Sequence, residues 1–403
     1  MAFFHSRLSP FPLRRLKAVG PLRSELRRLA LVLGLVATLA GGLAAAQEGT
    51  RSLTVLTHDS FSLPLELVEQ FSAATGIEVD FLAGGDAGEV VNRAILTKAR
   101  PLADLLFGVD DSLLERARAE GIFEPYLSPE LARVPEELWL DPAGLVTPVD
   151  VGYVVPNYDV AWFAEHGPHG DPALAELTMA DLADERHAEL LVALNPASSS
   201  PGLAFLLATI ARFGDPAAGI EGSAAADGAE PRFEDWLDFW AALRDNGVAV
   251  SDGWTEAYYT VFSHYGGDRP IVVSYASSPA AEVIFAEEPL ESSPTANLQC
   301  QGCAYRQIEG IGILKGTDEP EAARAFVDFM LSEEVQEAIP LAMFVAPVVT
   351  DAGVPEEFEH FAVLEPGVVA KPLSSAVVQA NQRRWLAQWT AVVRQGREPA
   401  SVR

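Results

Sequence analysis

Alternating strand and helix patterns between residues 52 and 121 are the feature that most limits what this chain can fold into. Three short apolar runs, typical of buried strands, occupy residues 52–58, 77–84 and 103–110. After each run, apolar residues recur at the three- and four-residue spacing of a helix. Strands joined by short helical crossovers pair in parallel, so the pattern predicts an α/β fold with helices flanking a mostly parallel sheet. The helices are expected at 63–76, 87–100 and 112–121.

Polar residues follow each of these three predicted strands. In open α/β sheets, ligands bind just beyond the carboxyl ends of the strands. We therefore expect the polar strand ends to form one edge of a binding site. The positions are His58, Asp59 and Ser60 after the first strand, residues 84–86 after the second, and Asp110 and Asp111 after the third.

The chain is too long for a single core, and two lobes are expected. Residues 144–160 have an extended pattern without a helical period, which indicates a crossing between the lobes. We predict that residues 47–150 plus about 290–350 form lobe 1 and that 151–289 form lobe 2. Residues 351–403 are expected to be a helical segment that packs on the lobes.

Further strand and helix patterns continue through the second half of the chain. A helix over residues 233–247 places Trp236 and Trp240 on one apolar face, where they are expected to fill the core. Residues 308–340 are expected to form a strand, a loop and one strong helix. The other strand–turn–helix units are predicted at 189–214 and 269–288.

The N-terminal segment, residues 1–46, has the composition of a secretory signal peptide. Basic residues precede an apolar run, and small residues end it at Ala46, as signal peptidase requires. A retained membrane anchor is the alternative, but the run is near the lower length limit for spanning a bilayer. We expect a protein exported to the periplasm or another extracytoplasmic space.

The formal net charge is −29, and removal of the basic N-terminal segment would make it more negative. Such a chain should repel nucleic acids and anionic membranes, and nucleic-acid binding is not expected. Cys300 and Cys303 form a C-Q-G-C sequence without a second cysteine pair. In an exported protein this spacing favours a small disulfide over a zinc site or a redox motif.

A run of serines at residues 198–200 stands directly before Pro201 and a predicted helix. Hydroxyl groups and free backbone N–H groups gather at such a helix start, where the helix dipole adds positive potential. The run therefore fits a seat for an anionic ligand group. An ordinary helix cap with spare serines explains it equally well.

Residues 250–267 concentrate aromatic side chains and allow two kinds of site. Tyr258 and Tyr259 with His58 and a carboxylate from Asp59 or Asp110 would give the oxygen-rich shell that suits ferric iron. However, adjacent residues point in different directions on a regular helix or strand, so two neighbouring tyrosines reach one metal only through a special turn.

The second kind of site is a pocket with aromatic walls that binds a flat organic cation. Trp254 follows Gly253 at an expected helix start, and Tyr275 ends a predicted strand. Aromatic faces attract cations, and the Asp59 carboxylate can pair with a positive ring or an amino group. Patterns of serine and metal hydrolases are absent from the sequence, so a secreted hydrolase is a remote alternative.

Eight pieces of the sequence carry a resemblance to a known family. They are "LTVLTHDSF", "ADLLFGVDDSLLERARAEGIF", "PVDVGY", "SSSPGLAFLL", "DGWTEAYYTVF", "VVSYASSPA", "GIGILKG" and "FVDFMLSEEVQEAIP". In order and spacing together, these pieces resemble the thiamine-binding periplasmic proteins of ABC transporters, from about Leu53 to about Val348. That family lies within a wider class that includes iron(III)- and polyamine-binding proteins.

The resemblance implies a two-lobed, type II-like binding-protein fold with thiamine or a thiamine phosphate in the cleft between the lobes. It further implies delivery to an ABC permease, no catalysis and no cofactor, and we expect a monomer. Ferric-iron binding stays the main alternative. By resemblance, Asp59 would pair with the aminopyrimidine, Ser199, Ser200 and Gly202 would face the phosphate or hydroxyethyl end, and Trp254 and Tyr275 would be aromatic walls. Ser60, Asp110, Tyr258 and Phe344 complete the expected ligand-binding set.

The sequence departs from this family pattern at two walls of the expected ring box. Ala281 stands where an aromatic residue is expected, and Phe344 stands in place of a tryptophan. Tyr259 need not be tyrosine in the pattern and is expected to serve packing. The C-Q-G-C pair is not part of it.

Overall fold

The computed structural model describes residues 51–166, 177–223 and 232–403. The predicted signal peptide lies outside the described residues. Eleven strands form one mixed sheet in the order β2-β1-β3-β10-β5-β8-β6-β7, with β4, β9 and β11 pairing off this path. The strands are β1 (Arg51–Thr57), β2 (Ile77–Ala83), β3 (Leu105–Asp110), β4 (Phe123–Glu124), β5 (Thr147–Asp159), β6 (Leu191–Leu194), β7 (Ala249–Ser251), β8 (Ile271–Tyr275), β9 (Thr295–Asn297), β10 (Tyr305–Leu314) and β11 (Ala346–Pro347).

Parallel pairing is found at the two ends of the sheet and antiparallel pairing at its centre. β1 pairs in parallel with β2 and β3, and β6 pairs in parallel with β7 and β8. The long strands β5 and β10 run antiparallel to each other and connect the two ends. The alternation at residues 52–121 is confirmed, including Gly76, which ends α2 in the left-handed conformation.

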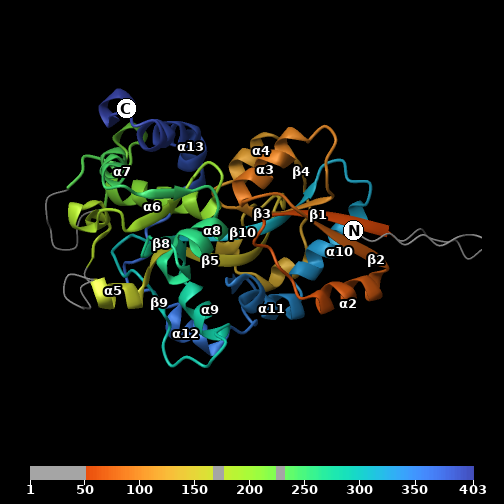
Figure 1. Ribbon diagram of the computed structural model, residues 1–403. Helices are drawn as coiled ribbons and strands as arrows, with labels where there is room; N and C mark the ends of the chain where they lie inside the picture. The colour runs from red at the N-terminus through yellow and green to blue at the C-terminus, as the bar shows by residue number, and fades with distance from the viewer. Residues whose placement is uncertain (1–50, 167–176, 224–231) are drawn as a thin grey trace, which may run out of the picture. The chain divides into compact units, whose positions relative to one another are not determined.

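Helices flank both ends of the sheet (Figure 1). α2, α3 and α4 connect or follow β1–β3, whereas α6 and α7 accompany β6 and β7. Within the described ranges, no helix is long and apolar enough to span a membrane. The helices are α2 (Leu65–Thr75), α3 (Ala87–Leu96), α4 (Leu114–Ala119), α5 (Val160–His166), α6 (Ser200–Phe213), α7 (Trp236–Asp245), α8 (Trp254–Glu256), α9 (Ser278–Ile284), α10 (Pro320–Met330), α11 (Glu333–Met343), α12 (Glu356–Phe361) and α13 (Ser375–Trp389).

Two sequence predictions about helices are resolved here. Trp236 and Trp240 are both fully buried, so the prediction that they fill the core is confirmed. The single helix predicted within residues 308–340 is wrong, because α10 ends at Met330 and α11 begins after Ser332. The Ser332 hydroxyl accepts a hydrogen bond from a backbone N–H of α11 and so starts a new helix.

The C-terminal helix α13 is anchored by two buried tryptophans. The indole N–H of Trp385 and the guanidinium of Arg384 both donate to the buried carboxylate of Asp215. Trp389 packs edge-on against Trp240 at 5.6 Å between ring centroids. The C-terminal segment therefore extends the core around α7, while the lobe boundaries given above stay a prediction.

Cys300 and Cys303 form a disulfide, as the sequence predicted. Both residues are buried in the loop before β10. The backbone of the following residue, Ala304, bonds to Val368 and Ala370, so the disulfide stands where the C-terminal segment joins β10.

Candidate functional site

A cavity of about 510 Å³ lies where the carboxyl ends of β1 and β2 meet α8, α9 and the end of α11. This volume falls within the range of about 300–1,000 Å³ that is usual for small-molecule sites. Aromatic side chains make up much of its wall. They are Phe61, Trp254, Tyr258, Tyr259, Tyr265, Tyr275, Phe285 and Phe344.

The charged groups on this wall are mostly carboxylates. Asp59, Asp86, Glu282 and Glu309 line the cavity together with one histidine, His58. Among the residues that the structure describes there, none is Lys or Arg. The wall therefore combines negative charge with aromatic faces, which favours a flat cationic ligand.

Asp59 and Asp86 hold the strand-end corner of the wall in place. The Asp59 carboxylate accepts a hydrogen bond from the N–H of Gly85 at 3.0 Å, and its own N–H donates to the Gly85 carbonyl at 2.9 Å. Asp86 caps α3 by accepting from the N–H of Ala87 at 2.8 Å. These bonds fix both carboxylates at the cavity edge that the strand-end rule predicted.

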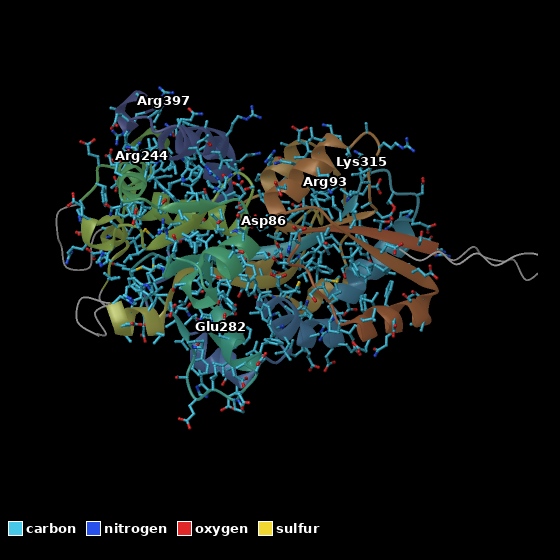
Figure 2. All side chains as sticks on the ribbon, in the orientation of Figure 1. Asp86, Arg93, Arg244, Glu282, Lys315 and Arg397 are labelled. Carbon is cyan, nitrogen blue, oxygen red and sulfur yellow. A yellow bond between two sulfur atoms is a disulfide. The ribbon has the colours of Figure 1, made fainter. Side chains whose placement is uncertain are left out.

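Asp86 also connects two parts of the chain that are far apart in sequence. Its second carboxylate oxygen accepts a hydrogen bond from the backbone N–H of Trp254 at 3.1 Å. Figure 2 shows Asp86 at the centre of the molecule, where α3 approaches α8. Burial raises the pKa of Asp86, although the N–H bonds from Ala87 and Trp254 work in the opposite direction. The expected site set omitted this residue.

His58 is paired with Glu309, which the sequence did not single out. The imidazole Nε2 lies 3.2 Å from a Glu309 carboxylate oxygen. Burial alone would lower the pKa of His58, but the charge and hydrogen bond of Glu309 outweigh burial and raise the pKa above 6.5. Gly108 makes room for the ring, since a Cβ atom there would lie 2.9 Å from the His58 Cδ2.

Glu309 is the middle member of a row of three carboxylates across the centre of the sheet. On β10 it lies opposite Asp110 of β3 on one side and opposite Asp150 of β5 on the other. Burial raises the pKa of Asp110 to about 6 and, with the nearby Glu309 charge, raises that of Asp150 well above 3.8. Asp110 is fully buried and stands behind the wall rather than on it.

A π-helical turn at Ala257–Val261 arranges the aromatic cluster. Its wider winding stacks Trp254 on Tyr258 at 5.0 Å and places the adjacent Tyr259 ring 5.3 Å from that of Tyr258. The Trp254 indole N–H donates to the Ser274 hydroxyl at 2.8 Å, which fixes the plane of the ring. Adjacent tyrosines thus reach one wall through a turn that the sequence did not reveal.

The two tyrosines have different surroundings. Tyr258 is 2% exposed and its hydroxyl donates to Glu282 at 2.8 Å. Tyr259 was expected to serve packing, whereas its side chain is 44% exposed and lines the cavity. Tyr275 also lines the cavity, and its ring lies over Gly152, where a Cβ atom would be only 2.9 Å away.

Glu282, labelled in Figure 2, lies on α9 and is the centre of a hydrogen-bond network. Besides the Tyr258 hydroxyl, its carboxylate accepts from the Tyr265 hydroxyl at 2.8 Å and pairs with the His264 Nε2 at 3.3 Å. Burial alone would raise the pKa of Glu282, but these bonds outweigh it and lower the pKa below 4.5. Glu282 is therefore a stable negative charge on the cavity wall.

The predicted anion seat at the start of α6 is built differently from what the sequence suggested. The Ser199 hydroxyl accepts from the N–H of Gly202 and so acts as a helix cap. The Ser200 hydroxyl donates to Asp110 and accepts from the Gln307 amide at 2.7 Å. Of Ser199, Ser200 and Gly202, only Ser200 lines the cavity. Gly202 packs on β6, where a Cβ atom would lie 2.8 Å from the Leu194 carbonyl oxygen.

The remaining predicted residues, Ser60 and Phe344, both line the cavity. Phe344 ends α11 with a φ of 59°, and its carbonyl accepts the Ser277 hydroxyl. Its ring meets Phe285 edge-on at 5.2 Å. Phe285 directly follows α9, four residues after Ala281, so an aromatic wall exists although position 281 is alanine.

Fold and cavity together describe an α/β protein in which helices flank a mixed sheet and a cavity of small-molecule size lies at the strand ends. A family model for bacterial extracellular solute-binding proteins matches residues 100–364, and the chain belongs to this family. The family is one of solute-binding proteins rather than of enzymes.

Individual relatives share most of this chain. It is 29% identical over 360 residues to the thiamine-binding periplasmic protein of Brucella suis biovar 1 (strain 1330), covering 87% of this chain and 94% of that one. The thiamine-binding periplasmic protein of Salmonella typhimurium is 28% identical over 346 residues, covering 85% and 93%. A solved periplasmic thiamin binding protein shares the fold with a TM-score of 0.68 at 23% identity, covering 85% and 96%.

Proposed function

We propose that this protein captures thiamine in the cavity and delivers it to an ABC permease. The observation that carries this proposal is the wall itself, in which aromatic rings and four carboxylates surround the space without a described Lys or Arg. Thiamine is a flat thiazolium cation joined to an aminopyrimidine, and both parts match that chemistry. The relatives named thiamine-binding proteins support the same ligand.

In this proposal three of the predicted residues on the wall have a defined role. Asp59 pairs with the aminopyrimidine, while Trp254 and Tyr275 provide aromatic faces for the rings. Each good cation–π contact contributes roughly 0.5–2 kcal/mol, and charge-assisted hydrogen bonds add to it. Closure of the two lobes over the ligand would then present a surface for the permease, as in other hinged binding proteins.

Ferric iron is the second candidate, because Tyr258, Tyr259 and His58 line one cavity. A ferric site needs phenolates, whereas the Tyr258 hydroxyl donates to Glu282 and its pKa is raised well above 10 by burial and by that carboxylate. A hydrolase is less favoured, since Ser200 bonds Asp110 and Ser278 bonds Ser274 rather than a histidine.

Calorimetric titration of unfolded and refolded, ligand-free protein tests the proposal. We expect one thiamine to bind per chain, and Asp59→Ala to weaken binding at least tenfold. Asp268→Ala is the matched control, because Asp268 is exposed and its contact is with Arg269. Absence of thiamine binding in the wild-type protein would refute the proposal, and equal affinity in Asp59→Ala would refute the role of Asp59.

A further inference from the structure

Glu309 differs from the other carboxylates on the cavity wall in how it is stabilised. Asp59 and Asp86 accept hydrogen bonds from backbone N–H groups. Glu282 accepts two tyrosine hydroxyls in addition to its contact with a histidine. Within the described ranges, the one side chain that bonds the Glu309 carboxylate is the His58 imidazole, at 3.2 Å. An imidazole gains or loses its proton near neutral pH, so the net charge of this pair can change there.

One oxygen of the Glu309 carboxylate is available to a ligand. Oε2 lies against His58, whereas Oε1 makes no hydrogen bond to a described residue. This atom is not sealed from solvent, and Glu309 lines the cavity, so Oε1 is open to the cavity. The side chain as a whole is only 11% exposed. A positive ring placed here would therefore meet a carboxylate that salt and water screen little.

Packing holds His58 beside Glu309. The ring centroids of His58 and Phe107 lie 5.5 Å apart, and the His58 ring lies over Gly108, where a Cβ atom would be 2.9 Å from its Cδ2. The imidazole lines the same cavity as the carboxylate. A protonated imidazole would stand next to a positive ring bound at Oε1, and like charges repel strongly where little water separates them. The proton and the ring therefore compete for one carboxylate.

Several neighbouring elements place titratable groups around His58 and its partner. They are Asp59 after β1, Asp86 at the start of α3, Asp110 of β3, Asp150 of β5, Tyr275 of β8 and Glu309 of β10. Burial would lower the pKa of His58, but the carboxylates of Glu309, Asp86 and Asp59 outweigh burial and raise the pKa above 6.5. In the ligand-free protein at pH 6.5, at least half of the molecules therefore carry the His58 proton.

We infer that Glu309 is the counter-ion for the positive ring of the bound ligand, and that His58 releases its proton when this ring binds. The inference rests on the proposed function and adds to it a binding residue and a dependence on pH. The proton passes from the imidazolium to the solvent, and the neutral imidazole stays beside the ring. Because the bound protein disfavours this proton, the affinity for a cationic ligand rises as the pH rises from 6.5.

Calorimetric titration with thiamine at pH 6.5 and pH 8, each in two buffers of different ionisation enthalpy, tests this inference. We expect thiamine to bind about twofold or more tightly at pH 8, with net release of protons to the buffer at pH 6.5. Equal affinity at both pH values without proton release, or tighter binding at pH 6.5, would overturn the inference. If thiamine binds at neither pH, the proposed function itself fails.

His58→Gln tests the source of the proton. The glutamine amide can donate a hydrogen bond to Glu309 but does not ionise, so we expect thiamine to bind without proton release and with the same affinity at both pH values. His360→Gln is the matched control, because His360 also pairs with a glutamate, Glu356, at 3.3 Å, but is exposed and off the wall. Proton release that persists in folded His58→Gln would come from another group and would overturn the role of His58.

Glu309→Gln tests the counter-ion. The variant keeps the size of the side chain and an acceptor for His58 but removes the charge, and we expect at least a tenfold loss of thiamine affinity at pH 8. Glu356→Gln is the control, since Glu356 is exposed and its partner is His360. Unchanged affinity in folded Glu309→Gln would overturn the assignment to Glu309. The wild-type comparison of the two pH values stands even if this variant fails to fold.

Discussion

Trp254 stacks on Tyr258 with 5.0 Å between ring centroids and an angle of 20° between ring planes. This stack exists because the chain passes directly from α8 into a π-helical turn, which brings residues four apart face to face. Both residues line the cavity, although Tyr258 is only 2% exposed, and Ser274 fixes the indole N–H of Trp254. The tryptophan is thus positioned and oriented before any ligand arrives.

Replacing Trp254 should weaken thiamine binding. Trp254→Ala removes one aromatic face, and we expect at least a tenfold loss of affinity, measured by calorimetry, because cation–π contacts contribute up to roughly 2 kcal/mol each. Trp254→Phe should lose less, since it keeps a ring but not the bond to Ser274. Trp162→Ala serves as the control, because Trp162 stacks on His166 away from the wall. Unchanged affinity in Trp254→Ala would exclude this tryptophan from the site.

Tyr258 provides a test that distinguishes the proposed thiamine site from a ferric-iron site. We expect the wild-type protein with added ferric iron to show no tyrosinate–iron charge-transfer band in the visible spectrum, because the buried phenol stays protonated on Glu282. Tyr258→Phe should then leave the spectrum unchanged. A visible band in the wild-type protein that vanishes in Tyr258→Phe would instead support a ferric site.

The buried carboxylate row predicts a pH dependence of stability. The folded-state pKa values of Asp110 and Asp150 are raised above the unfolded value of about 3.9. Below about pH 4 both carboxyl groups are protonated in the folded and in the unfolded protein. As the pH rises above this value, they lose their protons first in the unfolded protein. The free energy of unfolding should therefore fall as the pH rises from about 4 through the folded pKa of Asp110, about 6, and further for Asp150.

Asp150→Asn tests this dependence by urea unfolding at pH 5 and pH 8. Because the amide cannot ionise, we expect less stability to be lost between the two pH values in this variant than in the wild-type protein. Asp141→Asn is the control, since the Asp141 carboxylate accepts two backbone N–H bonds in a separate loop. An identical pH slope for wild type and Asp150→Asn would contradict the prediction.

The Cys300–Cys303 disulfide should stabilise the fold without affecting the ligand. It closes a very short loop, for which the loss of chain entropy corresponds to about 2 kcal/mol. A Cys300→Ser/Cys303→Ser variant should lose about that much free energy of unfolding in urea and keep its thiamine affinity, because neither cysteine lines the cavity. A large loss of thiamine affinity with an unchanged free energy of unfolding would contradict this prediction.

Local sequence patterns predicted the parts of the site that depend on a single strand or turn. Asp59 and Ser60 follow from the end of β1, and Trp254 follows from the helix start after Gly253. Glu309 could not be predicted in this way. It lies inside β10 and reaches the cavity only because of the register of that strand with β3 and β5. The available signal was a charged residue inside the apolar run "IEGIGIL", because a carboxylate is rarely buried unless it is paired.

The anion seat shows a second limit of such patterns. The serines before α6 fit the helix-dipole rule, but the rule does not reveal that Asp110, 90 residues earlier, bonds to Ser200. Similarly, Phe285 becomes a wall residue only through the packing of α9 against the end of α11, where it meets Phe344. Contacts between distant segments decide which locally plausible groups remain available to a ligand.

Mass spectrometry of the ligand released by denaturing freshly purified protein tests the proposed function most directly. We predict that thiamine or a thiamine phosphate is released, in an amount that Trp254→Ala reduces strongly. Release of ferric iron or of an unrelated small molecule from the wild-type protein, with no thiamine compound present, would contradict the assignment of this cavity.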